Sequence, residues 1–217
     1  IIVPNDMQIE AESSFTKIQE IGEIISEDFS EISSITNDAP EVFPLGETIV
    51  TWTTTDLSGN TASATQFISV VDTTAPSIIV PNDMQIEAES TFTKIQELGE
   101  TISEDFSEIS SITNDAPEVF PLGETIVTWT ATDLSGNTAS ATQIISVVDT
   151  TAPVIQTLKP FSFEGTSKSE NIFVLPIIEY VDNTEISSIT NDAPDSFEYG
   201  TTIVTWTVLD ISGNLSI

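Results

Sequence analysis

The sequence predicts an all-β chain of small Greek-key β-sandwiches that repeat in tandem. A motif, Asp-x-Ser-Gly-Asn, begins at Asp56, Asp133 and Asp210, at a constant spacing of 77 residues. A Thr/Val/Trp alternation precedes each motif, and this period of two is typical of a half-buried strand. The motif itself is turn chemistry, so each copy predicts a β-hairpin. Turn residues recur often enough for about six or seven short strands per repeat, which favours a Greek-key sandwich.

The strands of the second repeat follow from apolar runs bounded by Pro, Asn, Asp and Gly. Gly99 argues against a helix in the segment with helix-like spacing, and an acidic loop spans residues 104–108. In the strand before the hairpin, Trp129 shares a face with Val127 and is the expected core anchor. Trp52 and Trp206 have the same place in their repeats. The predicted strands are Ser77–Val80, Met84–Glu89, Phe92–Gln96, Leu98–Ser103, Ile109–Thr113, Thr125–Thr132 and Thr138–Val148.

Near-identity between repeats sets the domain plan. Residues 1–76 and 78–153 differ at five positions, whereas the third copy diverges before Asp182 and then rejoins the pattern. Proline-ended linkers are short and semi-rigid, so we expect an extended rod that is a segment of a longer protein. The expected domains are 1–72 (truncated at its N-terminus), 77–149 and 154–217 (divergent and incomplete at its C-terminus), with linkers 73–76 and 150–153.

Composition narrows the functional classes. Thirty-five acidic residues face four lysines, and the net charge is −31. Such a chain repels nucleic acid and anionic membranes, and its self-repulsion favours bound divalent cations. The sequence has no histidine and no cysteine, which excludes most catalytic triads, histidine-ligated zinc and disulfide cross-links. No apolar run reaches membrane-spanning length, so we expect no membrane insertion by this segment.

The motifs together resemble the HYR (hyalin repeat) domain. Asp-Thr-Thr-Ala-Pro, then Pro-Asn-Asp, then an acidic loop, then Phe-Pro-Leu-Gly-Glu-Thr-Ile-Val-Thr-Trp and Asp-Leu-Ser-Gly-Asn carry the resemblance. It covers nearly all of the first two repeats and the second half of the third. The resemblance implies immunoglobulin-like β-sandwiches in tandem, in adhesive proteins outside the cell.

The chain departs from the family pattern where that pattern commonly has two cysteines. Val3 and Val80 stand at the first position, and Ala64 and Ala141 at the second. Loss of a disulfide removes about 2 kcal/mol or more of stabilisation, and the acidic loops are the expected compensation. Acidic, cysteine-free repeats of this kind resemble bacterial and archaeal surface proteins, so we expect a prokaryotic cell-surface location.

The implied topology predicts metal centres. In an immunoglobulin-like domain, the loop between the second and third strands, the last hairpin and the incoming linker meet at one end. Oxygen ligands from three segments suit calcium, with an affinity of about 0.1–1 mM. The alternative is that each hairpin aspartate is turn chemistry alone. The expected ligands are Asp72, Glu104, Asp105, Asp133 and Asn137; Asp149, Asp182, Asn183 and Asp210; and, in the first repeat, Glu27, Asp28 and Asp56.

Three functions are open at this point. The favoured one is a non-catalytic structural or adhesive segment of an extracellular surface protein or filament, stiffened by calcium. The alternative is a carbohydrate- or ligand-binding module of a secreted protein, although the tryptophans fall at core positions. Paired carboxylates also serve glycosidases, but a triplicated pattern favours ligation over catalysis. We expect the partners to be neighbouring repeats or further copies of the chain. Two interpretations of the incomplete chain ends are open: strand donation into a filament, and simple truncation of a longer array.

Overall fold

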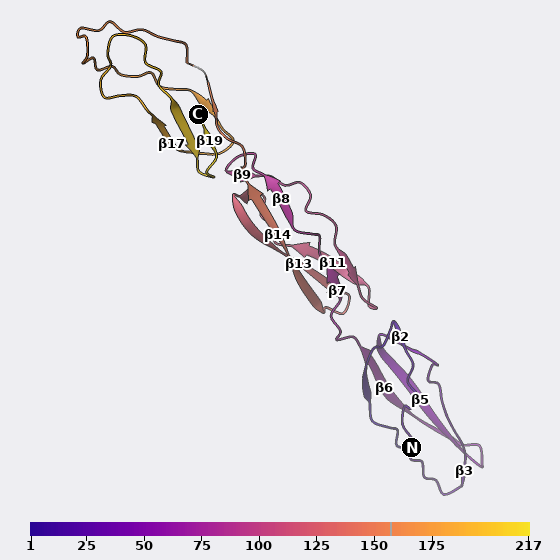
Figure 1. Cartoon of the computed structure of the whole chain (residues 1–217). Coiled ribbons are helices and arrows are strands. Elements are labelled where there is room, and N and C mark those ends of the chain that lie inside the picture. Colours follow the sequence, from indigo (N-terminus) through magenta and orange to yellow (C-terminus); the bar gives the residue numbers. More distant parts are fainter. Residues whose placement is uncertain (157) are drawn as a thin grey trace. The chain divides into compact units, whose positions relative to one another are not determined.

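The computed structural model describes residues 1–156 and 158–217, and every regular element in them is a β-strand (Figure 1). The predicted all-β, immunoglobulin-like class is therefore confirmed. Within the same residues, no helix is long and apolar enough to cross a bilayer. The strands are β1 Met7–Glu10, β2 Phe15–Thr16, β3 Ile32–Asn37, β4 Phe43–Pro44, β5 Gly46–Asp56, β6 Thr61–Val71, β7 Ser77–Ile79, β8 Met84–Glu87, β9 Phe92–Thr93, β10 Ile102–Glu104, β11 Ile109–Asn114, β12 Phe120–Pro121, β13 Gly123–Asp133, β14 Thr138–Val148, β15 Val154–Ile155, β16 Tyr180–Val181, β17 Ile186–Asn191, β18 Trp206–Asp210 and β19 Leu215–Ser216.

Each of the first two repeats is built on one four-stranded sheet. Its order is β1-β6-β5-β3 in the first repeat and β8-β14-β13-β11 in the second. The opening strand runs parallel to the last strand, and the other partners are antiparallel. Short pairs complete each repeat: β2 with β4 in the first, and β9 with β12 and β7 with β10 in the second. The hairpins that carry the repeated motif join β5 to β6 and β13 to β14.

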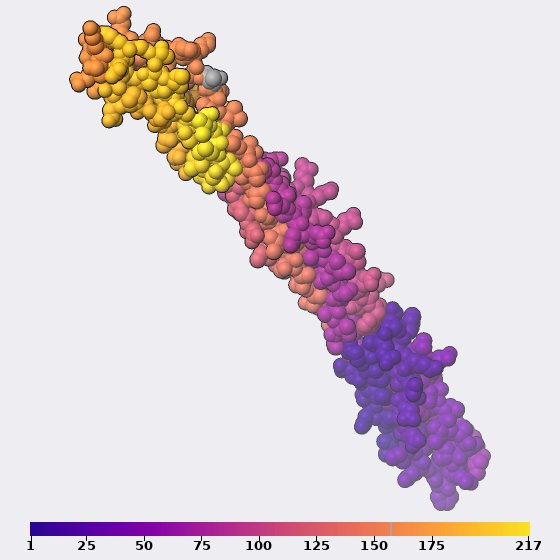
Figure 2. Space-filling view, in the orientation of Figure 1, coloured from indigo at the N-terminus to yellow at the C-terminus, as the bar shows by residue number. Residues whose placement is uncertain are grey.

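Alternation along β5 and β6 places the core residues. Val50 and Trp52 point inward from β5, and Ile68 and Val70 from β6, all with at most 6% of their surface exposed. Phe43 of β4 joins them. Trp129 is likewise buried, which confirms its predicted core position, whereas Trp206 is only half-buried. The space-filling view shows the outer surface of the first repeat in indigo and violet (Figure 2).

A buried glutamine supports the tryptophan, which the sequence patterns did not predict. Gln66 is fully buried and accepts a hydrogen bond from the Trp52 indole at 3.1 Å. Its amide nitrogen donates to the carbonyl oxygens of Asn5 and Ile21, at 2.8 and 2.9 Å. Since each of these groups finds a partner, the polar side chain is accommodated without a desolvation penalty.

Predicted and observed strands agree best at the hairpin. β14 has the predicted bounds, and Gly136 takes the positive φ of 92° that the turn needs. β9 and β10 are shorter than predicted, because Gly99 interrupts the run with a φ of 105° and lies against Pro81. A Cβ at this glycine would lie 2.7 Å from Cβ of Pro81, so the break requires glycine.

The third repeat has less regular pairing. β17, β18 and β19 form one sheet, and β15 pairs with β16. Its divergent first half contributes an aromatic cluster in which Phe163 stacks on Phe173, with ring centroids 4.3 Å apart. Phe161 meets Phe163 edge-on, at 5.1 Å. Phe161 and Phe163 are about half exposed, so this cluster lies at the surface of the repeat.

Contacts divide the chain into two compact units, and the division runs across the second repeat. The first unit holds residues 1–80, 101–114 and 129–141, and the second holds 81–100, 115–128 and 142–217. Each group of acidic residues described below lies within a single unit. The domain boundaries expected from the sequence and the rod-like arrangement stay predictions.

Candidate metal centres

The hairpin motif fixes its aspartate through the asparagine four residues later. The Asn137 amide donates to Oδ1 of Asp133 at 2.8 Å, and its side-chain nitrogen donates to Oδ2 at 2.9 Å. Asn60 and Asn214 hold Asp56 and Asp210 in the same way. Turn chemistry therefore accounts for the spacing within the motif, and it leaves further lone pairs of each carboxylate free for other partners.

A glutamate at the end of the opening strand positions the linker. Oε1 of Glu10 accepts the Thr73 amide and Oε2 accepts the Thr73 hydroxyl, both at 2.8 Å. The Thr74 hydroxyl also donates to Glu10, at 3.3 Å. The Thr73 amide is the main cause that lowers the pKa of Glu10. Glu87 holds the second linker by the equivalent three bonds, and its pKa is likewise lowered, chiefly by the Thr150 amide.

The first centre brings together Asp72, Asp105 and Asp133, from the linker, the loop after β10 and the hairpin. One carboxylate oxygen of each lies within 4.8 Å of the others. Asp72 and Asp133 are 8% and 1% exposed. The Asn137 side chain ties the segments together, because the same nitrogen that bonds Asp133 donates to the Asp72 carbonyl at 3.1 Å. The convergence of three segments expected from the topology is therefore present in the structure.

One oxygen of this centre has no hydrogen-bond partner. Oδ1 of Asp72 accepts the Thr74 amide at 3.0 Å, but Oδ2 is buried and unpartnered. Burial raises the pKa of Asp72, but the Ser107 hydroxyl, the Thr74 amide and the Ser135 hydroxyl outweigh it, and the pKa is lowered. Asp72 is thus an ionised side chain with an unsatisfied acceptor facing two more carboxylates.

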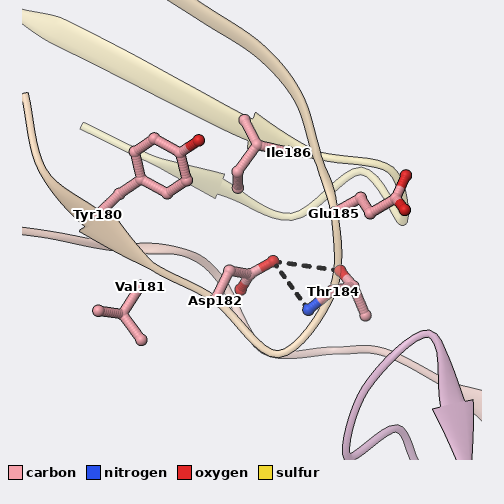
Figure 3. Close-up of a pocket in the computed structure, with 6 residues that line it drawn as sticks. All are labelled: Tyr180, Val181, Asp182, Thr184, Glu185 and Ile186. Carbon is pink, nitrogen blue, oxygen red and sulfur yellow. Dashed lines mark hydrogen bonds between the residues drawn. The ribbon is translucent and has the colours of Figure 1, made fainter.

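The second centre brings together Asp149, Asp182 and Asp210 by the same criterion of 4.8 Å. Here the Thr184 hydroxyl donates to Oδ2 of Asp149 at 2.6 Å and to Asp182 at 3.1 Å. Figure 3 shows the bonds between Thr184 and Asp182 beside the shallow depression next to the centre. Asn183 donates to Oδ1 of Asp149 at 3.0 Å. Burial raises the pKa of Asp149, but Thr184 and Asn183 outweigh it, and the pKa is lowered.

Two oxygens of the second centre are also unsatisfied. Oδ1 of Asp182 and Oδ1 of Asn183 are buried without a partner. The Asn183 nitrogen is already used, by Asp149 and by the Ala88 carbonyl at 2.8 Å. The Asn214 side chain donates to the Asp149 carbonyl at 3.1 Å, as Asn137 does in the first centre. This centre therefore offers free acceptors from the loop, whereas the first offers one from the linker.

The first repeat has only part of such a centre. Asp56 is buried, and the side chains of Asn60 and Ser30 lower its pKa to about 2. Asp28 is exposed and accepts the Ser30 amide at 3.1 Å. Among the described residues, no group of three carboxylates forms here. The predicted ligands Asp28 and Asp56 thus lie at the repeat positions of Asp105 and Asp133, without a third carboxylate.

Some predicted ligands have other roles in the structure. Glu104 is the last residue of β10, where it pairs with Ser77, and its side chain is exposed. Because alternation along the strand turns this side chain outward, Glu104 is not part of the first group of carboxylates. Glu27 is exposed as well. Asn137 contributes its nitrogen to tie two segments together. Glu10, Glu87, Ser107 and Thr184 were not predicted, since their partners are set by tertiary contacts.

The repeated sheets and the two groups of three carboxylates define a protein of tandem immunoglobulin-like repeats. Residues 71–147 match the HYR domain profile, so the second repeat is a HYR domain and the resemblance seen in the sequence is confirmed. Its near-identity to residues 1–76 extends this assignment to the first repeat.

Two curated proteins are similar to most of the chain. The chain is 39% identical over 199 residues to hyalin of Lytechinus variegatus, covering 84% of this chain and 37% of the relative. It is 38% identical over 201 residues to hyalin of Strongylocentrotus purpuratus, covering 85% and 17%. The chain thus spans well under half the length of these relatives. The expectation of a prokaryotic source is not supported, because these relatives come from animals.

Solved structures with some likeness have low scores. Fibronectin(III)-like modules of Clostridium thermocellum CbhA give a TM-score of 0.28 at 12% identity, covering 67% of this chain and 90% of theirs. Cadherin domains 1–4 of protocadherin gamma B7 give 0.33 at 13% identity, covering 97% and 67%. At these scores neither likeness supports an argument about this chain.

Proposed function

We propose that this chain is a non-catalytic structural and adhesive segment of an extracellular protein, in which calcium stiffens the linkers between repeats. The HYR match and the hyalin relatives support the extracellular, adhesive part. Near-identical repeats meet identical demands, which suits an array better than an enzyme with one asymmetric site. The observation that carries the calcium part is the buried, unpartnered Oδ2 of Asp72 among three carboxylates.

Electrostatics favour a cation at both centres. Three carboxylates within 4.8 Å repel one another, and the hydrogen-bond donors that the structure gives them are uncharged amides and hydroxyls. Carboxylate and amide oxygens in an irregular arrangement suit calcium, whereas magnesium prefers rigid octahedral sites with few protein ligands. Bound calcium would neutralise the repulsion and satisfy the free acceptors at Asp72, Asp182 and Asn183.

A cation would act mechanically on the linker. In the first centre it would join the linker aspartate to the loop and the hairpin of the following repeat. Glu10 already fastens the next linker residue, Thr73, to the preceding repeat. The linker would therefore be held from both sides, which restricts rotation about its few free bonds.

Two finer expectations remain proposals. The partners are neighbouring repeats or further copies of the chain, and strand addition to a sheet edge is one route to a filament. A ligand-binding module remains the alternative, and it would be favoured if a glycan bound with calcium absent. Glycan-array binding in chelator separates the two functions.

Thermal melting with calcium and with chelator tests the proposal. With an affinity of about 0.1–1 mM, 10 mM calcium would stabilise each centre by about 1.4–2.7 kcal/mol. Calorimetric titration should find two calcium ions per chain. Unchanged melting in calcium would refute the calcium part of the proposal.

A matched pair of variants locates the effect. Asp133→Asn should abolish binding at the first centre. Asp56→Asn disturbs the same hairpin hydrogen bonds in a repeat without a complete centre, so it should cost similar stability in chelator and leave calcium binding intact.

A further inference from the structure

The two near-identical repeats differ most in the surroundings of one phenylalanine. Phe29 is fully exposed, at 107% of the reference surface. Its counterpart 77 residues later, Phe106, is partly buried and packs against the core cluster of the first repeat. The Phe106 carbonyl also accepts the Ser14 hydroxyl at 3.1 Å. The same residue is therefore seated on a neighbour in one repeat and presented to solvent in the other.

The residues beside Phe29 match those of a centre that lacks one component. Asp28 and Asp56 correspond to Asp105 and Asp133, which meet Asp72 of the preceding linker. In the first repeat, Ser30 donates to Asp56 at 2.8 Å. The end face formed by Asp28, Phe29, Ser30 and Asp56 thus combines an exposed aromatic ring with two carboxylates.

We propose that this end face is a docking surface for the end of another HYR repeat of the same chemistry as the first repeat. The partner would supply an apolar end built like Ala11 and Phe43, and a following Asp-Thr-Thr-Ala-Pro linker. The seating of Phe106 on the first repeat is the template for the contact. Single exposed apolar side chains are common on protein surfaces; Phe29 differs from the others because its counterpart, Phe106, packs on a complementary apolar surface in the same chain.

The third repeat shows how the residue at this position changes the contact with the preceding repeat. Asn183 stands at the position of Phe106 and donates to the Ala88 carbonyl instead of packing on an apolar end. A repeat with asparagine there makes a polar junction, and a repeat with phenylalanine makes an apolar one. The ends that receive these two residues are alike, with Ala88 and Phe120 buried in the second repeat as Ala11 and Phe43 are in the first, so the residue at this position sets the kind of contact. This inference concerns packing and holds whether or not calcium binds.

The test compares the native chain with an extended chain in which residues 1–77 are joined in front of Ile1. Ile1 corresponds to Ile78, so the join restores the register that follows Ser77. Phe29→Ala should leave the Tm of the native chain unchanged and lower that of the extended chain by about 5 °C. Phe106→Ala should lower both by a similar amount, and all melts are run in chelator so that a failure of calcium binding does not affect the result.

A second measurement uses the absence of cysteine from the chain. Phe29→Cys introduces a single thiol, whose reaction with a thiol reagent should be at least tenfold slower in the extended chain. Phe106→Cys in the native chain is the protected control. Equal reactivity of Cys at position 29 in both chains, or a Phe29→Ala variant without effect in the extended chain, would overturn the docking surface.

Discussion

The two centres contain the same three carboxylates at corresponding repeat positions, but their neighbours differ. In the first, Asp72 keeps one oxygen without a partner. In the second, the hydroxyl of Thr184 and the amide of Asn183 occupy both oxygens of Asp149. The difference follows from two positions, where Asn-Thr replaces Phe-Ser. The same three carboxylates can thus have different numbers of unpartnered oxygens, according to the uncharged side chains around them.

The comparison predicts which centre depends more on calcium. Without a cation, the linker carboxylate of the first centre is buried with an unsatisfied acceptor, which is unfavourable. The second centre satisfies its linker carboxylate and leaves free oxygens on the loop, at Asp182 and Asn183. We therefore expect calcium to change the first centre more than the second.

The largest expected effect is that of Thr184→Val. It removes the donor to Asp149 and Asp182 and leaves a buried charged oxygen unsatisfied, so unfolding in chelator should become easier by about 1–3 kcal/mol. Denaturant titration measures this. Ser107→Ala is the matched variant in the first centre, where the hydroxyl makes a long bond of 3.4 Å to Asp105 and helps to lower the pKa of Asp72; its loss should be smaller, because no bond there is as short as the 2.6 Å bond from Thr184 to Asp149. Equal losses in the two variants would remove the distinction between the centres.

The second prediction concerns Asp72→Asn. The retained oxygen can still accept the Thr74 amide, and the new amide replaces the unpartnered oxygen, so stability in chelator should change by about 1 kcal/mol or less. Calcium stoichiometry should fall from two to one. Asp149→Asn should also remove one calcium, but at a clear cost in chelator, because it breaks bonds from Thr184 or Asn183. The comparison fails if Asp72→Asn is the more damaging variant in chelator.

The third prediction is an acid-sensitive stability. The pKa values of Asp72, Asp149, Glu10 and Glu87 are lowered in the folded chain. A lowered folded pKa contributes stability above the unfolded pKa and loses it as pH falls through the folded pKa. Tm in chelator should therefore fall as pH drops below about 4.5, and the Asp56 contribution should persist until pH approaches about 2.

Glu87→Gln sharpens this acid experiment. It keeps an acceptor for the Thr150 amide and removes the charge, so the slope of Tm against pH should become shallower. If the variant and the parent chain have equal slopes, the Glu87 carboxylate does not contribute to the loss of stability in this pH range.

The smallest expected effect is that of Asp28→Asn. The side chain is exposed and its Oδ1 can still accept the Ser30 amide, so stability should stay within about 0.5 kcal/mol. Calcium binding should not change, because this repeat has no complete group of three carboxylates among the described residues. Loss of one bound calcium in this variant would show that the first repeat has a centre of its own.

The sequence could predict features that depend on local spacing. The hairpin, the inward-facing Trp129 and the meeting of Asp72, Asp105 and Asp133 follow from strand alternation and from one implied topology. It could not predict that Glu10 reaches Thr73, since 63 residues separate them and only tertiary pairing of β1 with β6 brings them together.

Other features depend on side-chain direction or on small polar groups. Glu104 was predicted as a ligand from its place in an acidic run, but β10 extends through it and turns it outward. Gln66 and Gln143 lie in strands whose other buried residues are apolar, and the pattern gave no reason to pair Gln66 with a tryptophan. Thr184 has the composition of an ordinary loop residue, and only its two carboxylate partners reveal its role.

The parallel pairing of β1 with β6 has a consequence for a protein under tension. Pulling on the two ends of a repeat loads these terminal strands in opposite directions, so their backbone hydrogen bonds resist together in shear instead of opening one by one. The bonds of Glu10 to Thr73 and Thr74 lie directly beyond this ladder and extend it into the linker. Force that enters at the linker would reach β6 through the backbone, and the Glu10 carboxylate would pass part of it directly to β1.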